Sequence, residues 1–137
     1  MNHADELVGT VVLVNADLPY DPLGKQDQTG FIMEANLDLD DIYVDFTDSW
    51  VGLYAANALR TFLPVDQIEK NLDKVSVLED FDAVKQLTAI HLFVRYGDKG
   101  QQRTAMQIAR DNKSIQHLCL DSLQNQIDLK ISPGHER

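Results

Sequence analysis

Several residue types are scarce in this chain of 137 residues, and each scarcity excludes a class of protein. The single cysteine, Cys119, cannot form an internal disulfide, so a small fold held by disulfides is excluded. No run approaches eighteen apolar residues, which argues against a membrane-spanning helix. With 4 proline and 7 glycine residues the chain also lacks the composition of a disordered protein. We therefore expect it to fold as a globular protein.

The first residues, 1–6, lack both the basic start and the apolar centre of a signal peptide. We therefore expect a cytoplasmic location and no association with a membrane. Cys119 agrees with this location, and its neighbours Leu118 and Leu120 indicate a position beside a helical core rather than a reactive thiol.

Basic residues are scarce in the first half of the chain. Residues 1–64 hold eleven Asp or Glu against two bases, Lys25 and Arg60, which gives a net charge of about −9. Residues 65–137 hold eleven acids against ten bases, a net charge of about −1. An acidic surface repels nucleic-acid phosphates and anionic membranes, and long-range electrostatic steering favours cationic partners.

Motifs that carry catalysis are absent from the sequence. It has no glycine-rich phosphate loop, no nucleophile elbow and no His-Glu-x-x-His. Its four histidines lack a second His or Cys at the spacing of a zinc site; they are His3, His91, His117 and His135. We therefore expect no catalytic residue, no metal and no cofactor.

Residues 36–41 pack three carboxylates into one short segment, which raises the possibility of a calcium site. The segment lacks the central glycine and the twelfth-position glutamate of an EF-hand loop. We therefore expect a solvated turn between two strands. The carboxylate pairs Asp40/Asp41 and Asp45/Asp48 show no sign of a cleft that would raise one pKa for acid catalysis.

Short strands are the pattern of the first half. Runs of β-branched and alternating residues predict strands at about 7–14, 29–35, 42–47, 50–55 and 59–63. Between the first two strands lies a long loop, residues 15–28, which contains Pro19, Pro22 and Gly24. Five short strands with one long loop after the first are what a small closed barrel needs.

The same segments resemble a known family. The sequences GTVVLV from Gly9, GFI from Gly30, DIYVDF from Asp41, GLY from Gly52 and ALRTFL from Ala58 resemble an SH3-like barrel of the Tudor and KOW kind. The resemblance covers residues 6–64. It implies a binding fold, because such barrels bind peptides, methylated lysine or arginine, and nucleic acids.

Helical periods replace the strand pattern in the second half. Asp66 can cap a first helix, and Ser76 with Glu79 forms a capping-box pattern that opens a helix of about eighteen residues ending near Gly97. A third helix is predicted at about 101–111 and a fourth from Ser114, continuing past residue 127. The predicted fold is α+β, with a five-stranded SH3-like barrel at 1–64 and a packed extension of about four helices at 65–137.

One segment of this half, residues 104–118, resembles a single ankyrin unit, in which Thr-x-Leu-x-x-Ala opens the first of two helices. No second copy is found, and stacked repeats need about three members to bury their faces. We therefore interpret the segment as an ordinary helical hairpin.

Aromatic residues gather in the predicted hairpin at 41–54. If Ile42, Val44 and Phe46 fill the barrel, the pleat places Tyr43 on the outer face, and the partner strand can set Trp50 or Tyr54 beside it. Two interpretations remain open. The rings form a second core beneath the helices, or they stay exposed and, together with acids and a ring from the long loop, form a binding surface. The candidate binding residues are Tyr20, Tyr43, Asp45, Asp48, Trp50 and Tyr54.

Our leading hypothesis is a non-catalytic module that binds a basic protein partner, or an Arg/Lys-rich segment of one, through this acidic, aromatic surface. Recognition of methyl-lysine is a sharper version that needs rings on three sides of one hole. The alternatives are an acidic inhibitor or immunity protein that masks a basic enzyme, and a KOW-like nucleic-acid-binding protein. The last would use the basic residues Lys99, Arg103, Arg110 and Lys113, which a mixed-charge solvated face also explains. The sequence leaves the oligomeric state open.

Overall fold

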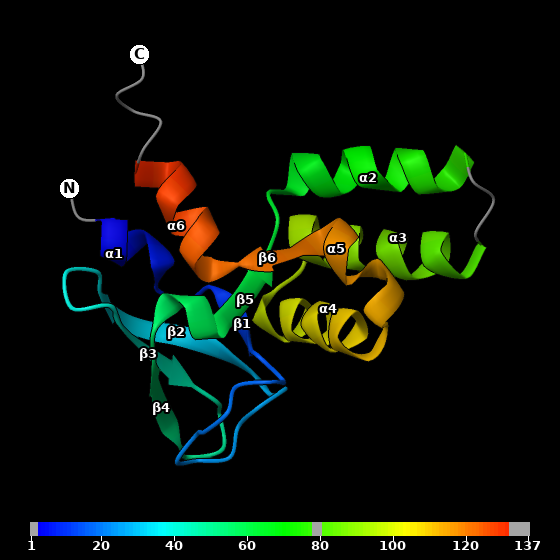
Figure 1. Cartoon of the computed structure of the whole chain (residues 1–137). Helices are drawn as coiled ribbons and strands as arrows, with labels where there is room; N and C mark the ends of the chain where they lie inside the picture. Colours follow the sequence, from blue (N-terminus) through cyan, green and yellow to red (C-terminus); the bar gives the residue numbers. More distant parts are fainter. Residues whose placement is uncertain (1–2, 78–80, 132–137) are drawn as a thin grey trace. The chain divides into compact units, whose positions relative to one another are not determined.

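The computed structural model describes residues 3–77 and 81–131 and has an α+β fold (Figure 1). The chain divides into two compact units. The sheet unit comprises residues 1–61 and 122–137, and the helical unit comprises residues 62–121. This division differs from the predicted one, because the C-terminal helix returns to the strands of the first half. Among the described helices, none combines the length and the apolarity that a membrane span requires.

Six strands form one open sheet in the order β4-β3-β2-β1-β5-β6. They are β1 (Val11–Val14), β2 (Thr29–Asn36), β3 (Asp41–Asp45), β4 (Val51–Tyr54), β5 (Leu59–Phe62) and β6 (Leu120–Ser122). Adjacent pairs among β1 to β5 are antiparallel. The five predicted strands therefore exist, but the predicted closed barrel of five strands is not confirmed. A sixth short strand joins the sheet, and β4 lies at its edge.

The start of the chain differs from the predicted first strand. A short helix, α1 (His3–Leu7), precedes β1. Gly9 has a φ of 90°, and its N–H donates to the Ile32 carbonyl of β2 at 2.7 Å. Glycine adopts this left-handed conformation without steric cost, so it turns the chain from the helix into the strand.

Burial in the sheet unit follows the alternation of the strands. Ile42, Val44 and Phe46 point into the core, as predicted, and are at most 3% exposed. Helix α6 (Leu123–Ile131) adds Leu123 and Ile127 to the same core. Strands β1, β2, β4 and β5 contribute further members: Val12, Val14, Ile32, Tyr54 and Leu59.

Gly30 of β2 shows how closely the strands pack in this core. A Cβ atom at Gly30 would lie 2.7 Å from Val44 Cγ1 and 2.8 Å from the Asp45 carbonyl oxygen. Because real Cβ atoms do not approach other atoms so closely, this position of β2 accepts only glycine without a shift of β3.

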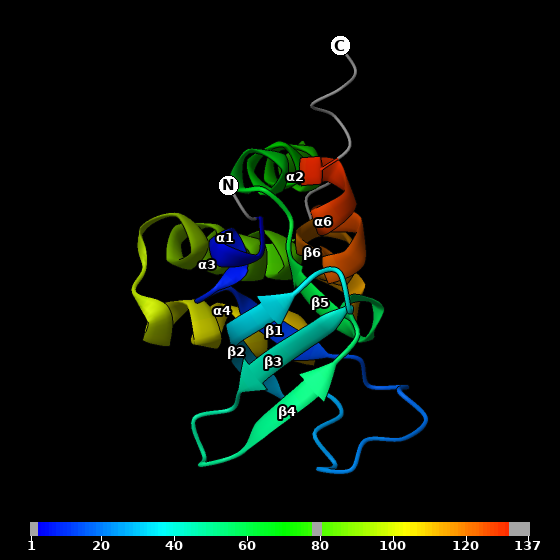
Figure 2. The same ribbon diagram turned by 90° about the vertical axis from the view of Figure 1, so that its left-hand side faces the viewer.

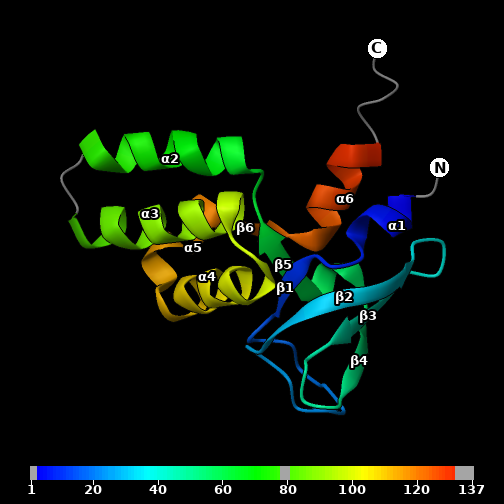
Figure 3. The ribbon, with the colours of Figure 1, turned by 180° about the vertical axis from the view of Figure 1, so that it is seen from behind.

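Helices account for most of the helical unit. They are α2 (Val65–Val77), α3 (Phe81–Tyr96), α4 (Lys99–Asp111) and the single-turn α5 (Gln116–Cys119). Helix α3 packs against both α2 and α4 (Figures 1 and 3). Buried residues from these elements include Ile68, Leu87, Ile90, Met106 and Ile115.

The predicted bundle of about four helices is not confirmed. The fourth helix, expected from Ser114 past residue 127, is divided into a 3-10 turn (Lys113–Ile115), α5, β6 and α6. The predicted capping box at 76–79 lies partly outside the described residues, and Ser76 belongs to α2. A capping box does open α4, where Asp98 Oδ1 accepts from Gln101 N at 2.9 Å and Asp98 N donates to Gln101 Oε1 at 3.0 Å.

The ankyrin-like segment fits an ordinary helical hairpin. Thr104 lies inside α4 rather than at its start, and its hydroxyl donates to the Gly100 carbonyl at 3.1 Å. A threonine that opened the helix would stand at its N-terminus and cap the free N–H groups there.

Candidate functional site

The long loop at 15–28 is fastened to β4 by one carboxylate. Asp21 accepts from the backbone N–H groups of Leu23 at 3.0 Å and Lys25 at 3.1 Å, which fixes the loop around it. The same side chain accepts from the Tyr54 hydroxyl at 2.6 Å. Loss of water and the hydrogen bond to Asp21 both favour the neutral phenol, so the pKa of Tyr54 is raised well above 10.0.

A second connection joins the loop to the turn between β3 and β4. The Lys25 ammonium lies 2.5 Å from Asp48 Oδ2 and 5.4 Å from the centre of the Phe46 ring. The hydrogen bond from Lys25 lowers the pKa of Asp48, and the Trp50 backbone N–H, which donates to Asp48 Oδ1 at 3.1 Å, acts in the same direction. Loop and turn therefore meet at one end of the sheet unit.

The turn itself has an unusual backbone. Thr47 and Ser49 have φ values of 63° and 76°, in the left-handed region that residues other than glycine rarely adopt. Asp45 Oδ1 accepts from Thr47 N at 2.8 Å, and the bond from Trp50 N to Asp48 supports the second half of the turn. The carboxylates of Asp45 and Asp48 therefore stabilise a backbone conformation that Thr47 and Ser49 disfavour. The turn ends at Trp50.

Four of the six predicted site residues are at least partly accessible at or near this end. Tyr20 is 76% exposed and Trp50 is 57% exposed. Asp48 is exposed, and Asp45 is half-buried. Tyr20 precedes Asp21 directly, and Trp50 follows Asp48 by two residues, so each ring stands in sequence next to a carboxylate that fixes the loop or the turn.

The predicted outward position of Tyr54 is wrong. Tyr54 is 6% exposed and belongs to the core, where its ring meets Phe46 edge-on at 6.2 Å between ring centres. The ring also lies over Gly52, since a Cβ atom there would stand 2.6 Å from Tyr54 Cε2. Register is the reason: Tyr54 pairs with Ile42, an inward residue, instead of lying beside Tyr43.

Tyr43 is half-buried on the outer face, opposite Leu53 and Glu34. On the outer face near β4, aliphatic side chains therefore lie beside the ring of Tyr43. Val51 and Leu53 are 46% and 54% exposed, and Asp45 lies opposite Val51.

Sequence reasoning missed Asp21, Lys25, Val51 and Leu53. Lys25 carried a signal, because it is one of two bases among the first 64 residues. A lone base inside an acidic segment favours an ion pair with one of its acids. Val51 and Leu53 carried none, because their exposure depends on the register of the hairpin.

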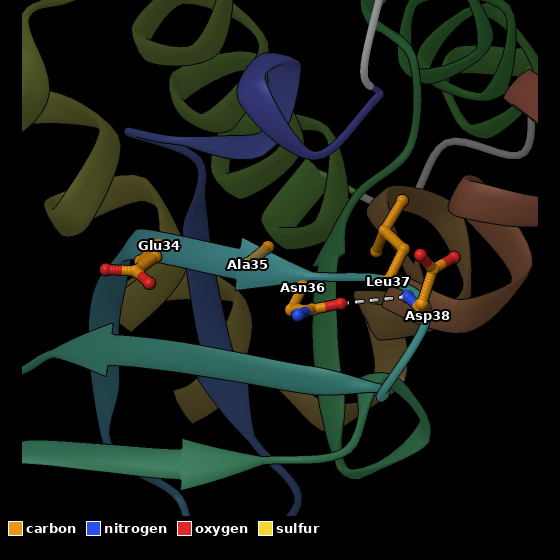
Figure 4. Close-up of a pocket in the computed structure, with 5 residues that line it drawn as sticks. All are labelled: Glu34, Ala35, Asn36, Leu37 and Asp38. Carbon is orange, nitrogen blue, oxygen red and sulfur yellow. Dashed lines mark hydrogen bonds between the residues drawn. The ribbon is translucent and has the colours of Figure 1, made fainter.

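Two shallow pockets lie elsewhere on the sheet unit. The first is lined by residues 34–38 at the end of β2 (Figure 4). The second shares Leu37 and also includes Asp40, Ala56, Gln124, Ile127 and Asp128. Both have acidic residues in their walls and lie apart from the loop and turn described above.

In the carboxylate-rich segment at 36–41, side-chain oxygens accept hydrogen bonds from backbone N–H groups. Asn36 Oδ1 accepts from the N–H group of Asp38 at 3.1 Å (Figure 4) and from that of Leu39 at 3.3 Å. Asp40 Oδ1 accepts from the Ala56 N–H at 2.9 Å. Within residues 3–77 and 81–131, no group of three or more His, Cys, Asp or Glu is arranged to hold a metal ion.

Three of the bases considered for nucleic-acid binding, Lys99, Arg103 and Arg110, lie on α4, and Lys113 opens the 3-10 turn after it. Arg110 forms an ion pair with Asp111 at 3.0 Å. Asp111 therefore lies among these bases and interrupts the continuous positive surface that phosphate binding would need.

Comparison with known proteins finds no relative for this chain: no family model, no curated protein and no solved structure gives a significant match.

Proposed function

We propose that this protein is a non-catalytic interaction module of the cytoplasm that binds a basic protein partner, or an Arg/Lys-rich segment of one. Binding occurs where the long loop meets the β3–β4 turn, with Trp50 and Tyr20 as the contacting rings and Asp45 and Asp48 as the acids beside them. The observation that carries this proposal is the exposure of the two rings, 57% and 76%, at the end of a strongly acidic unit.

We also propose that residues 6–64 belong to the SH3-like class of Tudor and KOW domains. The strand order β4-β3-β2-β1-β5 supports this relation, as does the 3-10 turn (Ala56–Ala58) between β4 and β5. Function does not follow from fold alone, so the proposal depends on the surface at this end.

Charge supports a cationic partner. The sheet unit holds thirteen Asp or Glu against four Lys or Arg in sequence, a net charge of −9. Lys25 is paired with Asp48 and offsets part of the charge of that carboxylate, so the attraction comes mainly from the net charge of the unit. Exposed aromatic rings attract cations by about 0.5 to 1 kcal/mol each, and by about 2 when the pair loses its water. Two such rings contribute about 1 to 2 kcal/mol together, or about 4 kcal/mol when both pairs lose their water, and the neighbouring carboxylates add to this attraction.

Binding of an arginine-rich peptide to the full chain, measured by calorimetry, tests the proposal. Trp50→Ala and Tyr20→Ala should each weaken binding by about 10-fold, or 1.4 kcal/mol, because interface rings commonly carry this much. Tyr96→Ala is the matched control: Tyr96 is 75% exposed and lies on α3 of the helical unit. It should leave the affinity unchanged.

The result that excludes this site is equal binding by wild type, Trp50→Ala and Tyr20→Ala. Labelled RNA and DNA, titrated at low salt, provide the comparison with the nucleic-acid alternative. Nucleic-acid binding that falls with salt and depends on Lys99 and Arg103 would replace the proposal.

A further inference from the structure

The edge of the sheet at β4 is open. Strand β4 pairs with β3 on one side, and within the described part of the chain no strand pairs with its other side (Figure 2). Its sequence, VGLY, contains neither a charge nor a proline. Natural edge strands commonly carry such residues because they prevent pairing with other chains. The side chains along this edge are therefore suited to strand pairing.

The hydrogen-bond phase of the hairpin shows which backbone groups face outward. Phe46 N donates to the Trp50 carbonyl at 3.2 Å, so residues 46 and 50 form a hydrogen-bonded pair. In an antiparallel ladder such pairs alternate with pairs that are not hydrogen-bonded. Gly52 and Tyr54 therefore direct their backbone groups toward β3, whereas Val51 and Leu53 direct theirs toward the open edge.

The side chains of the same two residues are accessible. Val51 is 46% exposed and Leu53 is 54% exposed, and both lie on the outer face beside Tyr43. Acids flank this apolar row: Asp45 lies opposite Val51, and Glu34 lies opposite Tyr43. An added strand would contact the apolar side chains of β4 directly, and the carboxylates would lie farther in on the same face, on β3 and β2.

We infer that β4 accepts an extended, lysine- or arginine-bearing segment of the partner as an additional strand. The N–H and C=O groups of Val51 and Leu53 form main-chain hydrogen bonds with the segment, and Leu53 contacts its apolar side chains. Charge selects this occupant over a second copy of the chain, because pairing two sheet units would bring together two net charges of −9. The inference rests on the proposed function and adds the mode of binding.

Amide hydrogen exchange, followed by nuclear magnetic resonance on the full chain, tests the inference. The probe is a capped peptide of alternating lysine and valine, about seven residues long, which spans a strand of ordinary length. We expect exchange at Val51 and Leu53 to slow by at least about 10-fold on saturation, because these amides gain acceptors. The amides of Gly52 and Tyr54 should change little, since β3 already provides their acceptors.

Methylated peptides separate strand addition from simple charge attraction. In a strand, the N–H groups of alternate residues point to opposite sides, so only every second residue of the peptide can bond with β4. N-methylation of the residues that face β4 should weaken binding by about 10-fold or more. N-methylation of the alternate residues, which face away, should leave binding unchanged. In the protein, Leu53→Lys should weaken binding of the lysine peptide. The matched control is Leu92→Lys, at a residue of α3 that is 47% exposed, and it should have no effect.

Four outcomes are distinguishable. Binding with protection of Val51 and Leu53 supports both the proposed function and the added strand. Lysine-peptide binding without that protection, or with equal effects of the two methylated sets, overturns the added strand and leaves the proposed function standing. Equal protection by a glutamate–valine peptide supports strand addition and overturns the preference for a cationic partner. No binding of either peptide at concentrations up to about 1 mM overturns both.

Discussion

Tyr54 connects three parts of the sheet unit through one side chain. Its ring packs edge-on against Phe46 and covers Gly52, and its hydroxyl donates to Asp21 in the long loop. A hydrogen bond from a neutral donor to a carboxylate contributes more than one between neutral groups, commonly about 1.5 to 3 kcal/mol. The residue proposed from sequence as part of a binding surface therefore has a structural role, since it holds the loop that carries Tyr20.

Tyr54 makes stability depend on pH in the alkaline range. Its folded-state pKa is raised above 10.0 by burial and by Asp21, so the folded protein keeps a proton that the unfolded chain loses. The stabilisation is complete below pH 10 and decreases as the pH rises above that value. Tyr54→Phe should lower the free energy of unfolding by about 1 to 2 kcal/mol at neutral pH. The difference from wild type should shrink above pH 10, as measured by urea unfolding at a series of pH values.

Tyr20→Phe provides the control for this prediction, because Tyr20 is 76% exposed. Its free energy of unfolding should follow that of wild type at every pH. A constant difference between wild type and Tyr54→Phe across the alkaline range would show that the phenol titrates alike in the folded and unfolded states.

At the scale of elements, the β3–β4 turn sets the geometry of the hairpin. Three residues, 47–49, separate the paired residues Phe46 and Trp50, and this length places Tyr54 opposite Ile42. Two of the three have positive φ values, which cost non-glycine residues about 1 to 2 kcal/mol each. The backbone of the turn is therefore strained next to Trp50. Strained backbone is commonly found at functional sites.

Ser49→Gly should relieve part of this strain. Glycine adopts a φ of 76° without steric cost but also loses more entropy on folding, so the expected net gain is about 0.5 to 1 kcal/mol in the free energy of unfolding. Chemical denaturation measures it. Ser49→Ala is the control, because alanine removes the hydroxyl and keeps the Cβ atom. Equal stabilisation by both variants would assign the effect to the hydroxyl instead of the backbone.

At the scale of the whole molecule, charge is distributed unevenly between the two units. The sheet unit carries −9 and the helical unit, residues 62–121, carries −1, although the second contains nearly as many acids per residue. The difference lies in the bases, eight of which belong to the helical unit. A cationic ligand is therefore attracted to the sheet unit before any contact forms.

Association with a cationic peptide should depend strongly on salt. Raising the ionic strength from about 0.01 M to about 1 M shortens the Debye length from roughly 30 Å to 3 Å, and the association rate should fall by at least about 10-fold. Stopped-flow fluorescence, with Trp50 as the single tryptophan, measures this rate. Tyr20→Ala should raise the dissociation rate and preserve the salt dependence of association. An association rate that does not change with salt would remove steering from the proposed mechanism.

The strands could be predicted from sequence because their signal is local. Alternation at Ile42 and Val44, continued by Phe46 just after the strand, identified the inward face of β3 correctly, and β-branched residues marked β1. Prediction failed where the chain folds back over a distance. The continuous apolar pattern after Ser114 indicated one helix, but α5 ends at Cys119 and α6 joins the core of the sheet unit.

The candidate site was predicted in part for the same reason. Tyr20 and Trp50 lie in a loop and a turn, where exposure is the ordinary expectation, and both are exposed. The contacts of Asp21 with Tyr54 and of Lys25 with Asp48 span 33 and 23 residues of sequence, and no local pattern indicates them.

The sequence by itself determined the acidity of the first half, the presence of five strands, and the presence of rings beside a tight turn, because composition and alternation are properties of neighbouring residues. Only the tertiary structure decided that Tyr54 faces inward, that Val51 and Leu53 line an open edge, and that the last helix joins the sheet unit. These features depend on strand register and on contacts between distant segments. A shift of one residue in the register would exchange the two faces of β4 without changing any residue of the chain.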